Sequence, residues 1–270
     1  EIVKLRAELA KLMGYRTFAE YSLDDTMAKT PDAVRGLLNQ VWSAAVERVG
    51  LVPRLVERGH EVTCVTRGAR APYLPHAAWA GVRMANLDRE ALEPKGLFAA
   101  RIAALGPEAV IDMLCFTPES AAQLCDGLEG RIQHYLCCGT IWVHGHSVEV
   151  PTTEEAPRAP FGEYGVRKAA MEAYLLDRAR RRGFPATVLH PGHIVGRGWA
   201  PLNPAGHFNP EVFTAIARGQ TLTLPNLGLE TVHHVHADDV AQGFVRALNA
   251  RQASPGQRFH LVSPAALSLR

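Results

Sequence analysis

Tyr164 and Lys168 stand four residues apart in a stretch whose apolar residues follow helical spacing. Residues at i and i+4 of a helix project from the same face, so the phenol and the ammonium group are expected to be neighbours. A nearby cation favours the phenolate, and we therefore expect Lys168 to lower the pKa of Tyr164. A tyrosine tuned in this way can act as a general acid or base, although solvated surface pairs show the same spacing.

A hydroxyl group is expected close to this pair. Thr140 follows the apolar run 134–138, which has the composition of a buried strand. Open parallel sheets bind ligands at the carboxyl ends of their strands, so Thr140 can hydrogen-bond a substrate carbonyl or alcohol oxygen there. The predicted strand 186–190 runs into the loop 191–196 at the same edge of the sheet.

These residues belong to a regular alternation of short apolar runs and helical stretches that begins near Gly50. Such alternation is typical of a parallel sheet covered by helices, and it predicts a doubly wound α/β fold. The predicted strands span residues 61–66, 81–84, 109–114, 134–138, 186–190 and 258–262. The predicted helices span residues 51–58, 97–105, 118–128, 165–182, 210–217 and 237–249.

The composition favours a globular protein that acts on small molecules. The chain has 270 residues, of which 29 are basic and 27 acidic, so a net charge of +2 gives no basic surface for nucleic acid. No apolar run approaches the roughly 20 residues of a membrane span, and no signal-peptide pattern is present. We therefore expect a cytoplasmic protein with a small-molecule substrate, without nucleic-acid or membrane partners.

Four stretches in a fixed order carry a resemblance to a known family. They are residues 138–145, the Tyr-x-x-x-Lys of 164–168, residues 190–196 and residues 234–241. With them, residues 51–270 resemble the extended short-chain dehydrogenases, the NAD-dependent epimerase/dehydratase family. The resemblance implies a Rossmann-like fold in which Tyr164 is the acid/base, Lys168 tunes it and binds the nicotinamide ribose, and Thr140 polarises the substrate oxygen.

The resemblance also implies which residues hold the cofactor. Arg67, just past the strand predicted at 61–66, stands where an arginine can meet a 2′-phosphate, which favours NADP over NAD. A solvated turn residue beside Gly68 is the alternative explanation of Arg67. The implied cofactor-binding residues are Arg67, Asn86, Leu87, Cys115, Lys168 and Pro191.

The resemblance places three histidines, His144, His193 and His234, on the substrate side. His234 and His236 would share one face of an extended segment, which could suggest a metal site. No third ligand is spaced to complete it, and we expect no metal.

One part of the family pattern is missing. The family begins with a strand and a Gly-x-x-Gly-x-x-Gly loop, whose glycines let the backbone approach the pyrophosphate. Here Arg48-Val49-Gly50 leads almost directly into a helix. We therefore expect a sheet without its usual first strand, exposed backbone edges on the neighbouring strands, and weak or absent cofactor binding.

The first 49 residues are predicted to form helices only. Leu5–Tyr15 and the following stretch to Pro31 resemble a helical part of the zinc peptidases of the thimet oligopeptidase and dipeptidyl carboxypeptidase type. The His-Glu-x-x-His motif of those enzymes is absent, because the second histidine does not follow His60-Glu61. We expect a fusion of a helical segment, 1–49, to a Rossmann-like domain, 50–270, that is truncated at both ends.

The function that these features favour is that of an NAD(P)-dependent oxidoreductase or epimerase-like enzyme. Hydride would pass to or from a carbonyl or alcohol carbon while Tyr164 moves the proton, with activity impaired by the missing loop. The alternatives are a non-catalytic dinucleotide sensor or an inactive fusion product, and, more remotely, a zinc metallopeptidase fragment. Relatives often dimerise through two helices, one of which here carries Tyr164 and Lys168, so a homodimer is also expected.

Overall fold

A computed structural model describes residues 8–16, 50–68, 75–147, 149–196, 203, 209–229 and 231–268. The chain divides into two units, Glu1–Val46 and Glu47–Arg270. In the first unit residues 8–12 form a helix, within the stretch where the apolar spacing predicts one. The helices expected between residue 17 and residue 49 lie outside the described residues, so the domain boundary stays a prediction.

The second unit contains a four-stranded parallel sheet. Its order is β3 (Ala109–Asp112), β4 (His134–Cys138), β5 (Ala186–Pro191) and β9 (Arg258–Leu261). Every residue of β4 and β5 is buried, which explains why these strands are continuous apolar runs without alternation. The predicted α/β fold is confirmed.

A second parallel sheet holds only β1 (Thr63–Thr66) and β2 (Arg83–Asn86). Among the described residues no strand joins it to the larger sheet, and β1 and β3 each have one unpaired edge. Gly50 leads directly into α4 (Leu51–Glu57), where a first strand and its loop would otherwise stand. The expected loss of the first strand stays a prediction, because residues 17–49 lie outside the described part of the chain.

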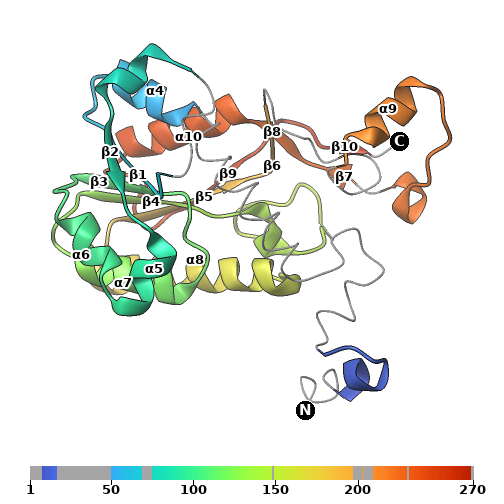
Figure 1. Cartoon of the computed structure of the whole chain (residues 1–270), viewed down its shortest axis with the longest axis horizontal. Coiled ribbons are helices and arrows are strands. Elements are labelled where there is room, and N and C mark those ends of the chain that lie inside the picture. The colour runs from blue at the N-terminus through green and yellow to red at the C-terminus, as the bar shows by residue number, and fades with distance from the viewer. Residues whose placement is uncertain are drawn as a thin grey trace. The chain divides into compact units, whose positions relative to one another are not determined.

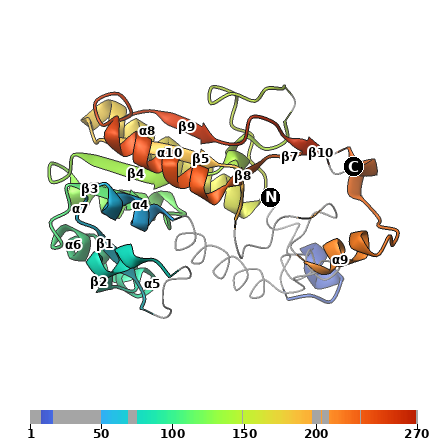
Figure 2. The same cartoon turned by 90° about the horizontal axis from the view of Figure 1, so that it is seen from above.

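Helices cover both faces of the larger sheet (Figure 1). The helices α6 (Phe98–Ala103), α7 (Pro118–Leu128) and α8 (Gly162–Arg182) pack side by side on one face. On the other face, α10 (Ala237–Asn249) lies along β4 and β5 and contacts α4 (Figure 2). Apolar side chains of α6, α7 and α8 form the main core against β4 and β5.

The remaining elements are short, and several had no signal in the sequence. They are α5 (Arg89–Leu92), β6 (His193–Val195), α9 (Glu211–Ala217), β7 (Thr231–Val232), β8 (His234–His236), β10 (Leu267–Ser268) and the 3-10 helices η1 (Ala77–Gly81), η2 (Glu93–Lys95), η3 (Ile141–His144) and η4 (Pro225–Gly228). The strand expected at 81–84 lies two residues later, as β2. No helix in the described residues is long and apolar enough to span a membrane.

A glycine allows α6 and α7 to approach closely. A Cβ atom added at Gly127 would lie 2.7 Å from the Cβ of Ala99, and the short alanine side chain cannot swing away. We predict that Gly127→Ala lowers the free energy of unfolding by about 1–3 kcal/mol, because overpacking outweighs the gain in helix propensity. Denaturant titration of both proteins measures the difference.

The matched control is Gly81→Ala, whose added Cβ would meet its nearest neighbour at an ordinary 3.7 Å. Its stability should stay within about 0.5 kcal/mol of the parent chain. Equal stability of the Gly127→Ala variant and the parent chain would show that α6 and α7 can separate freely.

Candidate active site

Helix α8 carries the tyrosine and the lysine and is well terminated at both ends. Glu163 lies in its first turn and three arginines, Arg180–Arg182, lie in its last turn, so charges of both signs complement the helix dipole. Gly183 closes it in the left-handed conformation that favours glycine. The helix therefore holds Tyr164 and Lys168 on one rigid face.

Tyr164 meets Thr140 at the carboxyl end of β4. The two hydroxyl groups are hydrogen-bonded to each other. Thr140 is buried, and its Oγ1 accepts a hydrogen bond from the Trp142 backbone N–H at 3.3 Å, which caps η3. The structure thus brings together the phenol and the helper hydroxyl that the sequence placed 24 residues apart.

Lys168 is fully buried one turn further along α8. Its Nζ donates to the carbonyl oxygen of Cys115 at 2.6 Å and to that of Cys138 at 2.7 Å. Its ammonium group also lies 4.6 Å from the centre of the Phe116 ring. Cys115 follows β3 and Cys138 ends β4, so one cation joins two neighbouring strand ends to the helix.

The pKa of Tyr164 differs from the expectation. Burial raises the pKa of Tyr164 above its ordinary value, Cys138 raises it further, and the hydrogen bond from Thr140 offsets only part of the rise. The expectation of a lowered pKa for Tyr164 is wrong here, because burial has the largest effect on the phenol. Tyr164 is consequently a neutral phenol at neutral pH and a proton donor.

Two aromatic residues that the sequence did not single out frame the phenol. The ring of Phe116 lies 6.4 Å and that of Trp142 lies 6.5 Å from the ring of Tyr164, between centroids. Trp142 also contacts His193 edge-on at 5.9 Å. The sequence marked these two residues only by their place next to the predicted strand ends. Aromatic residues at such places are common in ordinary cores.

The three histidines expected on the substrate side do not share one environment. His193 and His234 are register partners in the parallel pair β6–β8, with ring centroids 6.1 Å apart. Burial, and then the charge of His234, lower the pKa of His193 to about 4. His144 is buried, with 5% of its surface exposed, and its ring contacts His190 and His260. It therefore packs inside the fold instead of lining an open surface.

The residues expected at the adenosine end come together at the ends of β1 and β2. Thr66 and Asn86 are register partners, and the Leu87 N–H donates to the Thr66 carbonyl at 2.8 Å. Arg67 follows β1 directly and is half exposed, with its Nη1 3.7 Å from Glu90 Oε2. The exposed guanidinium group is positioned so that it can meet an anion.

The described residues fit the nicotinamide and adenosine ends of a dinucleotide well and its pyrophosphate poorly. Pro191 ends β5 and is buried at the same sheet edge as Thr140, where a nicotinamide ring could lie. In the described residues no glycine-rich turn connects a strand to a helix to hold the pyrophosphate, since only Gly50 precedes α4. Residues for the nicotinamide and adenosine ends are present, whereas a pyrophosphate cradle is not among the described residues.

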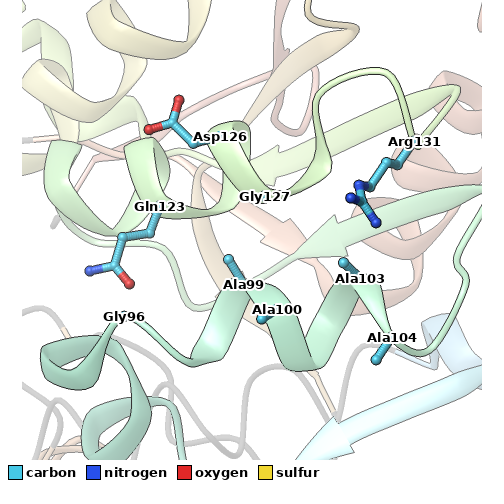
Figure 3. A pocket seen from close by; sticks show the side chains of 9 residues that line it. All are labelled: Gly96, Ala99, Ala100, Ala103, Ala104, Gln123, Asp126, Gly127 and Arg131. Carbon is cyan, nitrogen blue, oxygen red and sulfur yellow. The ribbon is translucent and has the colours of Figure 1, made fainter.

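A surface pocket of about 610 Å³ lies elsewhere, between α6 and α7 (Figure 3). Small residues and three polar side chains line it: Gly96, Ala99, Ala100, Ala103, Ala104, Gln123, Asp126, Gly127 and Arg131. It shares no lining residue with the site at Thr140 and Tyr164, so we assign it no part in the chemistry.

A doubly wound sheet with a tyrosine, a lysine and a threonine at its carboxyl edge defines a Rossmann-like, dinucleotide-dependent class of enzyme. The family described as NAD dependent epimerase/dehydratase matches residues 50–261. The chain belongs to this family of NAD(P)-dependent enzymes, and the resemblance that the four stretches predict is confirmed.

Individual relatives are distant. The 2'-dehydrokanamycin reductase of Streptomyces kanamyceticus is 27% identical over 215 residues, which cover 80% of this chain and 58% of that relative. The chain thus spans little more than half of the reductase. The crystal structure of UDP-glucose 4-epimerase from Thermus thermophilus in complex with NAD is 19% identical with a TM-score of 0.62, covering 82% of this chain and 76% of that one.

The beginning of the chain matches a different family. Residues 1–50 match Peptidase family M3. A mitochondrial intermediate peptidase of Phaeosphaeria nodorum is 50% identical over 42 residues, which cover 16% of this chain and only 5% of the peptidase. The expected junction of a peptidase-like segment and a dehydrogenase-like domain is therefore supported by both matches.

The buried ammonium group of Lys168 gives a stability prediction. Lys168→Met retains an unbranched chain but leaves the carbonyls of Cys115 and Cys138 without their donor. We predict a loss of about 2–4 kcal/mol in the free energy of unfolding, since each unsatisfied buried carbonyl costs about 1–3 kcal/mol. The control Lys95→Met, at an exposed position, should change stability by less than about 0.5 kcal/mol. Similar denaturation midpoints for the two variants would contradict the assigned role.

Proposed function

We propose that the chain is a carbonyl reductase in which Tyr164 delivers the proton. The observation that carries this proposal is the hydrogen-bonded pair of Tyr164 and Thr140 above a buried Lys168. Because burial keeps the phenol protonated, the resting site is set to donate a proton, which reduction of a carbonyl requires. The similar 2'-dehydrokanamycin reductase supports the same direction.

Each residue has a separate task in this proposal. The hydroxyls of Thr140 and Tyr164 hydrogen-bond the substrate carbonyl oxygen and polarise it. A bound nicotinamide cofactor supplies the hydride. Tyr164 then passes its proton to the developing alkoxide oxygen, while Thr140 continues to donate its hydrogen bond to that oxygen. Lys168 holds the strand ends beneath the pair, so that the distance between hydroxyl and substrate stays fixed.

The missing pyrophosphate cradle weakens cofactor binding in the same proposal. Backbone N–H groups at a glycine-rich turn are the main anion ligands of such sites, and the described residues supply none. We expect NADPH to bind this chain with a dissociation constant weaker than about 100 μM, which corresponds to roughly 5.5 kcal/mol. Tighter binding would show that the loop is dispensable.

A second candidate function is a non-catalytic protein that arose by fusion. The divided sheet, with unpaired edges on β1 and β3, favours this candidate, because a complete enzyme of this class would join them through a central strand. The two candidates differ in one measurable property. A reductase loses turnover when Tyr164 loses its hydroxyl, whereas a non-catalytic protein has no turnover to lose.

Tyr164→Phe is predicted to reduce turnover at least about 100-fold, because it removes the proton donor and keeps the ring. The assay follows NADPH oxidation at millimolar cofactor with a panel of cyclic ketones that includes 2'-dehydrokanamycin. NADPH affinity, measured by nicotinamide fluorescence, should stay within about twofold of the parent chain. Tyr174→Phe, the same exchange ten residues further along α8, is the control and should keep full turnover. Equal turnover in the Tyr164→Phe variant and the parent chain would refute the role of Tyr164.

Arg67 is proposed to select NADP over NAD through the 2′-phosphate. Arg67→Ala should weaken NADP binding by about tenfold or more, because a charge-assisted hydrogen bond contributes about 1.5–3 kcal/mol, and should leave NAD binding unchanged. Calorimetric titration with both cofactors measures the two affinities. Arg58→Ala, at an exposed position after α4, is the matched control. An equal loss for NAD and NADP would assign Arg67 to general electrostatics instead.

A further inference from the structure

Three histidines from separate elements converge behind the catalytic residues. His190 in β5 and His260 in β9 are register partners in adjacent strands, and His144 ends η3. One ring nitrogen of each lies within 4.8 Å of the others. His144 and His190 are buried and His260 is partly buried, so this histidine cluster is shielded from solvent.

The polar atoms of the cluster are incompletely satisfied without a further group. Both ring nitrogens of His190 and the Oε2 atom of Glu172 are buried without an aligned hydrogen-bond partner. The Oε2 atom lies 3.0 Å from His190 Nε2, although the geometry is not that of a hydrogen bond. Buried polar atoms of this kind are rare in native proteins and call for an explanation such as an ion.

The ring of His144 is oriented as a ligand would be. It donates one hydrogen bond to the backbone carbonyl of Pro157, and its Nε2 shares a hydrogen bond with the Nε2 of His260 at 2.9 Å. Arg158 Nη1 also lies 3.3 Å from Nδ1 and 3.4 Å from Nε2 of His144, so an ion would replace the hydrogen bond between the rings and displace this guanidinium group. Hydrogen bonding of one ring nitrogen to a carbonyl is the usual way in which proteins fix the other nitrogen for a metal.

The surrounding charges are compatible with a cation. The carboxylate of Glu172 is buried, with 4% of its side chain exposed, and its Oε2 lies 3.0 Å from His190 Nε2. Arg158 binds the Oε1 atom of Glu172 at 2.6 Å and leaves Oε2 unbonded. Together with Glu154 and Glu155 nearby, three carboxylates outnumber the two guanidinium groups, Arg158 and Arg258.

We propose that His144, His190, His260 and Glu172 form a structural binding site for one divalent transition-metal ion, with Zn²⁺ as the ion that this ligand set fits best. Zinc–nitrogen bonds of about 2.1 Å place tetrahedral nitrogen ligands roughly 3.4 Å apart, between the 2.9 Å and 4.8 Å of the cluster. Small ring rotations therefore suffice to bring the three histidine nitrogens to one ion, and Glu172, whose Oε2 lies 3.0 Å from His190 Nε2, would complete the ligand set. Four protein ligands without an open position indicate a structural ion instead of a catalytic one.

The site would reinforce the catalytic residues from below. Glu172 lies one helical turn after Lys168 on α8, and the ring of His190 packs so closely on Gly139 that a Cβ there would meet it at 2.3 Å. Gly139 immediately precedes Thr140. An ion at this position joins β5, β9, η3 and α8, the elements that hold Thr140 and Tyr164 together.

The proposal is tested by titrating the purified full chain with Zn²⁺. The chain is first dialysed against a chelator, which is then removed. We expect one equivalent of Zn²⁺ to bind with a dissociation constant tighter than about 1 μM. The variants His144→Gln and His260→Gln should each weaken binding at least about 100-fold, and Glu172→Gln by about 10- to 100-fold. His146→Gln removes an exposed histidine next to η3 and should bind zinc as the parent chain does. Weak binding by the parent chain, or equal binding by His260→Gln, overturns the proposal.

A measurement on the unaltered chain covers the case in which the variants do not fold. Co²⁺ bound at this site should show the visible absorption of a tetrahedral complex with nitrogen and oxygen ligands. The five free cysteines are the alternative ligands, and a thiolate-to-cobalt charge-transfer band in the near ultraviolet would reveal them. Such a band, or octahedral cobalt absorption, would refute the histidine site whatever the activity of the enzyme.

Discussion

A single buried ammonium group connects the parts of the site. Lys168 Nζ bonds the backbone carbonyls of Cys115 and Cys138, which lie at the ends of two adjacent parallel strands, and it does so from helix α8. A buried charge is costly unless it is well paired, so the strand ends and the helix cannot shift independently. Tyr164, one turn earlier on the same helix, is thereby fixed against Thr140 just past β4.

This arrangement explains why the site persists in a divided sheet. The proposed catalytic residues depend on β3, β4, β5 and α8, which form one continuous part of the fold with a common core. The residues of the adenosine end depend on β1 and β2, which pair only with each other in the described structure. The gap between the two sheets of the described structure therefore affects the link between the cofactor ends and leaves the pair of Tyr164 and Thr140 intact.

The surroundings of Tyr164 decide its charge state in a way that residue spacing alone did not predict. Lys168 was expected to tune Tyr164, but its charge is directed at backbone carbonyls, and burial raises the tyrosine pKa. Burial likewise lowers the pKa of His144 and that of His260. In both places desolvation has the largest effect on the charge state, so the protonation of the site follows from packing more than from neighbouring charges.

The sequence by itself determined the α/β alternation, the strands that hold the site, the limits of α7, β4 and α10, and the tyrosine, lysine and threonine of the active site. Periodicity and residue spacing are local properties, and they decide which side chains share one helix face or one strand end. Only the tertiary structure decided the burial of Tyr164, the partners of Lys168 and the meeting of His144, His190 and His260. His144 and His190 are 46 positions apart along the chain, and His190 and His260 are 70 positions apart. No local pattern encodes how far such segments lie from one another in space.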